Sequence, residues 1–206
     1  WTDSVLGQEP VRGGWDRQAA AAYLDGRQSW WMDWPTAARD QGTYCVSCHT
    51  VTPYALGRAA LRRVTAPGVV ERRMLDSVEH RVLAWDEMQP FYSDEQVRPG
   101  KTRESRGTEA ILNVLILANR DAQAGRLSGS TKQAFEHLWA LQRTDGADAG
   151  AWAWLDFGLE PWETSKAQYY GAALAAVAVG LASQKGLVHT SGMVSLRTYL
   201  RTQLDD

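Results

Sequence analysis

Two cysteines and a histidine lie within five consecutive residues, and no other stretch of the sequence is better suited to chemistry. Cys45 and Cys48 are the only cysteines in the 206-residue chain, and His49 follows directly. The spacing C-x-x-C-H is the attachment signature of a c-type haem. Two thiols at this spacing can form thioether bonds to the vinyl groups of one porphyrin, and the histidine can bind its iron. The motif predicts one covalent haem c with His49 as the proximal iron ligand.

Two other interpretations of the same residues remain open. A C-x-x-C pair can form a redox-active or structural disulfide, although that motif usually follows a strand in a βαβ unit, whereas residues 39–43 form a polar turn. A zinc site needs four ligands, usually with a second Cys or His pair, and the other histidines, His80, His137 and His189, are scattered singly. Haem attachment is the working hypothesis.

The sixth iron ligand would decide what such a haem does, because a Met or His there favours electron transfer and an open position favours small-ligand chemistry. Met32 is the first candidate, since it precedes the motif closely and lies in a run of tryptophans. Met88 is the second, and His80 and His189 follow. An ordinary core methionine is the competing interpretation of Met32.

Residues near the motif are candidates for holding the porphyrin. Residues 30–35 read Trp-Trp-Met-Asp-Trp-Pro, and so much apolar area predicts either core packing or part of a haem pocket. From this setting Trp31 and Tyr44 are predicted to contact the haem. Arg58 is predicted to pair with a propionate, because arginine binds carboxylates well, and a solvated helix face would explain it equally. Glu109 and Glu163 are expected to open helices, where carboxylates are favoured.

Composition narrows the class of protein. The net charge of −2 gives no basic surface for nucleic acid and no polybasic membrane patch. The longest apolar run, residues 172–182, is too short for a transmembrane helix, which needs about 20 residues. Because c-type haem is attached outside the cytoplasm, the hypothesis predicts a periplasmic or otherwise extracytoplasmic protein whose leader is removed or lies outside this sequence.

Helical periodicity dominates, and no alternating strand pattern is evident. The expected helices are residues 15–24, 54–64, 69–85, 107–124, 130–143, 163–184 and 192–204, with a loop over 90–106. The sequence therefore predicts a single all-α domain of antiparallel helix pairs over residues 1–206. Its first part, residues 1–66, would carry the haem, and its second, residues 67–206, would consist of helix pairs.

An internal echo indicates the arrangement of those pairs. Gln142 and Gln203 lie 61 positions apart (203 − 142), each after an aromatic-Leu pair, and Gln142 is followed by Gly150-Ala151-Trp152. The order resembles the QW repeat of squalene–hopene cyclases and related α/α-toroid proteins, in which the glutamine caps helix ends and stacks on the tryptophan. The resemblance covers roughly residues 107–206 and implies a partial toroid, completed by a longer chain or a second chain. The layout also looks like haem-carrying toroid proteins of bacterial envelopes.

The resemblance does not bring cyclase chemistry with it. The DxDD acid motif of triterpene cyclases is absent, and the zinc ligands of protein prenyltransferases have no counterpart. The sequence instead predicts an exported monohaem cytochrome c that transfers electrons to a redox partner protein or within a membrane-bound electron-transfer complex. The alternatives are a haem enzyme or small-ligand sensor with an open distal site, and a scaffold subunit in which the haem is structural.

Overall fold

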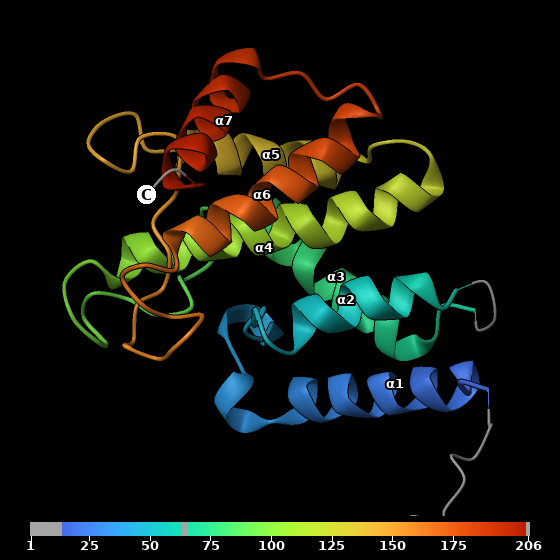
Figure 1. The fold of residues 1–206 in the computed structure, drawn as a ribbon. Helices are drawn as coiled ribbons and strands as arrows, with labels where there is room; N and C mark the ends of the chain where they lie inside the picture. Colours follow the sequence, from blue (N-terminus) through green and yellow to red (C-terminus); the bar gives the residue numbers. More distant parts are fainter. Residues whose placement is uncertain (1–13, 63–65, 205–206) are drawn as a thin grey trace, which may run out of the picture.

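The computed structural model describes residues 14–62 and 66–204, and all regular structure in this part of the chain is helical (Figure 1). The α-helices are α1 (Arg17–Asp33), α2 (Val51–Ala60), α3 (Val69–Leu83), α4 (Lys101–Ala124), α5 (Gly129–Ala140), α6 (Gln168–Ser183) and α7 (Thr190–Leu204). Two 3₁₀ turns, Pro35–Ala37 and Asp40–Gly42, precede the cysteine motif. Within the described ranges β-type pairing is limited to two isolated bridges, Ala38 with Tyr44 and Leu159 with Glu163. The predicted all-α class is confirmed.

Helix α4 is the centre of the fold, because α2, α3, α5 and α6 all contact it. Every residue from Gly107 to Ala118 is buried, so this stretch is apolar on nearly all sides, as a core helix must be. Gly107 makes close packing possible: a β-carbon there would lie 2.1 Å from the carbonyl oxygen of Ala153. The loop that follows α5 therefore crosses directly over the first turns of α4.

Helices α1, α2 and α3 form the other part of the fold, with α1 along its outer edge (Figure 1). Asp16 caps α1 by accepting hydrogen bonds from the backbone N–H groups of Gln18 and Ala19, both at 2.9 Å. The expected end of this helix at Asp25-Gly26 is wrong, and α1 runs on to Asp33. Asp25 instead accepts hydrogen bonds from Tyr54 Oη at 2.8 Å and Arg58 Nε at 3.0 Å, which join α1 to α2.

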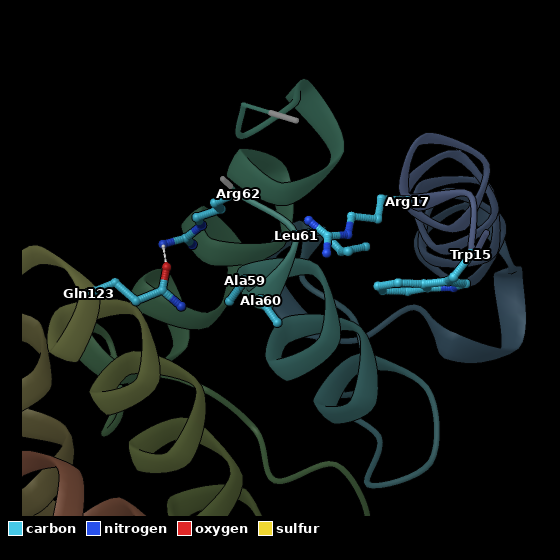
Figure 2. Close-up of a pocket in the computed structure, with 7 residues that line it drawn as sticks. All are labelled: Trp15, Arg17, Ala59, Ala60, Leu61, Arg62 and Gln123. Carbon is cyan, nitrogen blue, oxygen red and sulfur yellow. Dashed lines mark hydrogen bonds between the residues drawn. The ribbon is translucent and has the colours of Figure 1, made fainter. Parts of the chain in front are cut away.

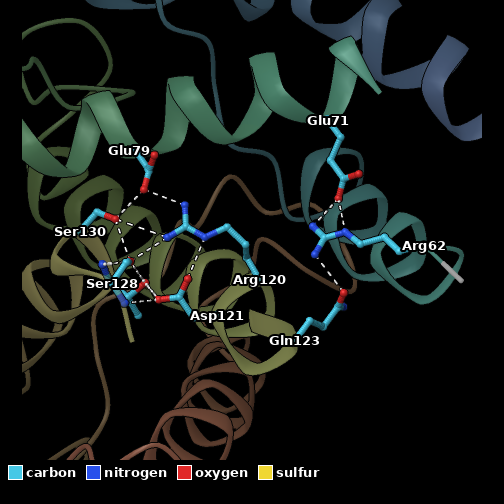
Figure 3. A network of polar contacts seen from close by, with 9 residues as sticks. Arg62, Glu71, Glu79, Arg120, Asp121, Gln123, Ser128 and Ser130 are labelled. Carbon is cyan, nitrogen blue, oxygen red and sulfur yellow. Dashed lines mark hydrogen bonds and ion pairs between the residues drawn. The ribbon is translucent and has the colours of Figure 1, made fainter. Parts of the chain in front are cut away.

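A polar network ties α3, α4 and α5 together (Figure 3). Arg120 Nη1 donates to Glu79 Oε1 at 2.6 Å and Arg120 Nε to Asp121 Oδ1 at 2.8 Å. The other oxygen of Asp121 accepts from the backbone N–H of Ser128 and from Thr131 Oγ1, both at 2.6 Å. Burial alone would raise the pKa of Asp121, but these hydrogen bonds outweigh it and hold the pKa below its usual value.

Gln142 and Trp152, the residues of the QW-like segment, make contacts between helices. Gln142 Nε2 donates to the carbonyl oxygen of Gly150 at 2.9 Å and to that of Gly192 at 3.0 Å. Trp152 Nε1 donates to Leu138 O at 2.6 Å. The glutamine thus links the end of α5 to the first turn of α7, and the tryptophan lies beneath α5.

The expected starts of α4 and α2 are wrong, for local reasons. α4 begins at Lys101 and not at residue 107, because Asp94 Oδ1 accepts the N–H of Thr102 at 2.8 Å and so caps the helix from the preceding loop. α2 begins at Val51 and not at residue 54, because Ser47 Oγ accepts the N–H groups of Thr50 and Val51. The expected lead-in over residues 1–13 and the expected helix end at residue 64 lie outside the described residues.

None of the helices in the described ranges is long and apolar enough to cross a bilayer. This agrees with the prediction that the chain lacks a membrane span, within the residues that the structure describes.

Candidate functional site

The cysteine motif lies in an extended segment that leads into α2. The N–H of Cys45 donates to Ala37 O and the N–H of Arg39 donates to Thr43 O, both at 2.8 Å, so residues 37–39 and 43–45 pair as a short antiparallel ladder. His49 follows in the turn that begins α2 and is exposed. These hydrogen bonds fix the backbone at Cys45.

Cys45, Cys48 and His49 line the same small cavity, whose volume is about 50 Å³. Both thiols are free and buried. The cavity's other walls are mainly aromatic and apolar, and they come from α1, the loop before α4, α4 itself and the loop before α6: Trp31, Val46, Ser47, Phe91, Tyr92, Thr108, Leu112, Trp154, Leu155 and Glu163. The two thiols and the imidazole thus border one space, as a common porphyrin requires.

Trp31 holds the motif against α1. Its Nε1 donates to Cys45 O at 2.9 Å, and its ring meets the His49 ring edge-on with centroids 5.6 Å apart. Tyr44 is also buried, but its side chain lies toward α1 and α3. Burial raises the pKa of Tyr44, and the other side chains that affect this pKa belong to those two helices. Of the two predicted haem contacts beside the motif, Trp31 lines the cavity and Tyr44 does not.

Burial disfavours the thiolate form of both cysteines. Burial raises the pKa of Cys45 to about 12 and that of Cys48 to about 11. Redox-active C-x-x-C pairs have the opposite property, a lowered thiol pKa. The electrostatics therefore do not favour the disulfide-exchange interpretation.

The wall opposite the motif is formed by α4 and the loop between α5 and α6. Thr108 Oγ1 accepts the N–H of Leu155 at 2.9 Å, and Trp154 packs against Gly171 of α6 so closely that a β-carbon there would lie 2.4 Å from its ring. Glu163 lies at this wall, and burial raises its pKa while the charge of His49 partly offsets the effect. Glu163 was expected to open a helix, but α6 begins only at Gln168.

A buried ion pair lies behind the motif. Arg81 Nε and Nη2 donate to the two carboxylate oxygens of Glu109 at 2.6 and 3.2 Å, and both side chains have 0% exposure. Arg81 Nη1 also donates to Thr43 Oγ1 at 2.8 Å. Burial raises the pKa of Glu109, and Arg81 opposes that rise. The expected helix-opening role of Glu109 is wrong, because α4 begins eight residues earlier and the carboxylate fixes the cysteine segment through Arg81.

The predicted distal ligands lie outside the cavity wall. Met32 is buried in α1, and Met88 is buried with its Sδ 3.9 Å from Arg81 Nη1. His80 is exposed on α3, and His189 stacks on Trp139, far along the chain, with ring centroids 4.6 Å apart. The structure brings none of these four side chains to the cysteine cavity, so the identity of a sixth ligand stays a prediction.

Arg58 is engaged away from the motif. It is fully buried, it pairs with Asp25 at 3.0 Å, and its Nη2 donates to Ala66 O at 2.8 Å. The cavity wall does not include it.

A larger cavity of about 670 Å³ lies between α1 and α2 (Figure 2). Among the described residues its lining contains neither a cysteine nor a histidine nor a carboxylate, and Arg62 in it is held by Gln123 at 2.9 Å and by Glu71. Size alone therefore does not make it the better candidate site. Across residues 14–62 and 66–204, no group of three or more His, Cys, Asp or Glu side chains is placed to hold a metal ion, which gives the zinc interpretation no support.

Sequence reasoning found the motif and Trp31 but missed the opposite wall. Phe91, Thr108 and Trp154 reach the cavity from loops and helices far along the chain, and no local pattern marks them. Comparison with known proteins adds no further assignment, since no family model, curated protein or solved structure matches this chain.

Proposed function

We propose that this chain is an extracytoplasmic monohaem c-type cytochrome that takes part in electron transfer. The observation that supports it most is that two free, buried thiols and the adjacent imidazole line one aromatic cavity. Haem c would be attached through Cys45 and Cys48, with His49 as proximal ligand, and when bound it would supply one-electron exchange. The protein's part is to hold and shield it.

The two thiols and the imidazole suit a haem c, but the cavity that they line is smaller than a porphyrin. Sites for ligands of cofactor size have about 300–1,000 Å³, whereas the cysteine cavity has about 50 Å³. Side chains of the cavity wall must therefore move when the porphyrin is attached. Trp31, which donates to Cys45 O, would keep the proximal side in place, and Phe91 and Trp154 would exclude water.

The proposed setting is a redox partner protein or a membrane-bound electron-transfer complex, on a partial α/α toroid. The Gln142 hydrogen bonds to the carbonyls of Gly150 and Gly192 support that arrangement, because they couple one helix pair to the next as the QW-like resemblance implies.

A second candidate is a haem enzyme or small-ligand sensor with an open distal position. One observation favours it: among the described residues, no methionine and no histidine other than His49 lines the cavity. Optical spectra of the purified protein separate the two candidates. A low-spin spectrum that is unchanged by carbon monoxide supports the electron carrier, and a high-spin spectrum that shifts with carbon monoxide supports the open site.

Matched variants make the test specific. A Cys45→Ala/Cys48→Ala double variant should lose the haem absorbance that survives denaturation, whereas Met74→Leu, in the core of α3, should keep it. Met32→Leu and Met88→Leu test the predicted ligands in turn: if the spin state is unchanged in both, neither methionine binds the iron. Covalent absorbance that persists without the two cysteines would contradict the proposal.

A further inference from the structure

Arg39 lies in the short ladder that precedes the cysteine motif. Arg39 is half-buried, and no carboxylate in the described residues lies within ion-pair distance of it. Its Nη1 donates to the carbonyl oxygens of Thr36 at 2.9 Å and Ala38 at 2.7 Å, while its buried Nε has no hydrogen-bond partner. Buried donors without acceptors are rare and need a reason.

The short ladder places Arg39 on the same side as Cys45. Ala38 pairs with Tyr44, so Ala37 lies opposite Cys45 and Arg39 lies opposite Thr43. Successive side chains alternate between the two faces of such a pairing. Arg39 and Cys45 therefore share a face as diagonal neighbours, at roughly 7–8 Å, which is within reach of long side chains.

A groove of about 450 Å³ lies in front of this arginine. Arg39 and Asp40 line it, together with Phe91 and Tyr92, and these two aromatic residues also line the cysteine cavity. The Arg39 guanidinium lies over the Tyr92 ring, 5.0 Å from its centroid. Phe91 and Tyr92 thus border both the small space that holds the thiols and the larger space that holds the cation.

The charges around the groove suit a carboxylate ligand at Arg39. Among the described lining residues the acid is Asp40, and backbone groups bind both of its carboxylate oxygens: Oδ1 accepts the N–H of Gln41 at 2.9 Å and Oδ2 accepts the N–H of Gln89 at 3.1 Å. Guanidinium groups bind carboxylates through two parallel N–H donors, and Nε is one of the usual pair. The buried Nε has no acceptor among the described residues, so it is available as one of these two donors when a carboxylate reaches Arg39.

We propose that the groove headed by Arg39 receives the propionate edge of the haem, and that Arg39 pairs with a propionate carboxylate. This inference rests on the proposed haem function. In this proposal Arg39 takes the role that the sequence suggested for Arg58. The Arg58 guanidinium is already bound to Asp25 and to the carbonyl oxygen of Ala66. Haem attachment then joins the small cavity to the groove by displacing the Phe91 and Tyr92 side chains.

The test measures the midpoint reduction potential of the haem-bearing protein. Arg39→Ala should keep its covalent haem but show a lower potential than wild type, because removing a cation beside the propionates stabilises the more positive ferric state. Arg103→Ala is the matched control, since Arg103 is exposed on α4 and forms no ion pair within the described part of the chain. Its potential should equal that of wild type.

Two further variants keep the test decisive if Arg39→Ala does not accumulate. Arg39→Gln should lower the potential in the same way, and Arg39→Lys should keep the potential near wild type while the propionate bending band in the resonance Raman spectrum shifts. A wild-type chain without covalent haem would overturn both proposals. Haem-bearing Arg39→Ala or Arg39→Gln with an unchanged potential would overturn the Arg39 site alone.

Discussion

Removing one residue of the buried Arg81–Glu109 pair should lower the free energy of unfolding strongly, whereas replacing both residues should lower it much less. Arg81 has 0% exposure and donates to both carboxylate oxygens of Glu109, to Thr43 Oγ1 and to Gln89 O. Its guanidinium also lies 4.4 Å from the centroid of the Phe91 ring. Arg81→Met would remove all of these contacts while leaving the Glu109 carboxylate inside the protein.

The expected magnitude follows from that burial. Removing one partner of a buried ion pair costs about 3–5 kcal/mol, because the remaining charge is uncompensated, whereas replacing both partners by apolar groups is often neutral or stabilising. Arg106 is a second cation near Glu109, with its Nη1 3.8 Å from Glu109 Oε2. We therefore expect Arg81→Met and Glu109→Leu each to lose about 3–5 kcal/mol, and the double variant to lose much less than their sum.

Urea denaturation of the four proteins at pH 7 measures this, and a loss of about 3–5 kcal/mol is a large share of a typical stability of about 5–15 kcal/mol. The pH dependence supplies a second readout. Because the pKa of Glu109 is raised in the folded state, the folded form holds this proton more tightly than the unfolded chain. The stability that this proton contributes is fully present below the pKa of Glu109 in the unfolded chain. It is lost as the pH rises through the pKa of Glu109 in the folded protein. Arg81 opposes the rise in the pKa of Glu109, so removing Arg81 raises that pKa further. The loss of stability in Arg81→Met should therefore be larger at pH 8 than at pH 5. If the double variant loses the full sum of the single losses, the pair is not coupled as described.

Three further predictions follow from the structure. In chain produced without haem, alkylation of Cys48 at pH 8 should be slower than that of a free thiol by about two orders of magnitude, since a pKa of about 11 leaves little thiolate; an alkylation rate equal to that of a model peptide would refute it. Gly107→Ala should lower the free energy of unfolding by about 1–3 kcal/mol, because the new β-carbon drives Ala153 O away from α4. Gly129→Ala is the control, since a β-carbon there meets nothing within 4 Å, and it should be neutral or slightly stabilising. Equal effects of the two changes in denaturation curves would contradict the close approach at Gly107. Asp121→Asn should lose roughly 1.5–3 kcal/mol at pH 7, and because the pKa of Asp121 is lowered the difference from wild type should shrink as pH falls below about 4; an undiminished difference at pH 3 would argue against it.

The helical class could be predicted because the signal is local. The helical periodicity of residues 107–124 is present in the sequence, and the structure forms a helix there that ends at Ala124 as expected. Helix starts were harder to predict. α4 begins at Lys101 because the Asp94 side chain caps it from across a loop, and no pattern within the helix reports such a contact.

The candidate site likewise has one part that the sequence predicts and another that depends on tertiary packing. Cys45, Cys48 and His49 are contiguous, so their spacing alone predicts the chemistry. The opposite wall depends on the packing of α4 against the loop before α6, which brings Trp154 and Glu163 to the motif from more than 100 positions away. The proposed propionate partner is a further example. The sequence favours Arg58, which follows the motif on an expected helix, but the folded chain pairs Arg58 with Asp25. Arg39 instead lies on the same face of the short ladder as Cys45.

The most direct test of the central claim is the mass of the native protein under denaturing conditions. Covalent attachment at Cys45 and Cys48 predicts that the intact chain carries the mass of one haem and that this excess persists when disulfides are reduced. The excess should map to the peptide that contains Cys45, Cys48 and His49. A native chain with no added mass, and with both thiols free to be alkylated after unfolding, would contradict the account.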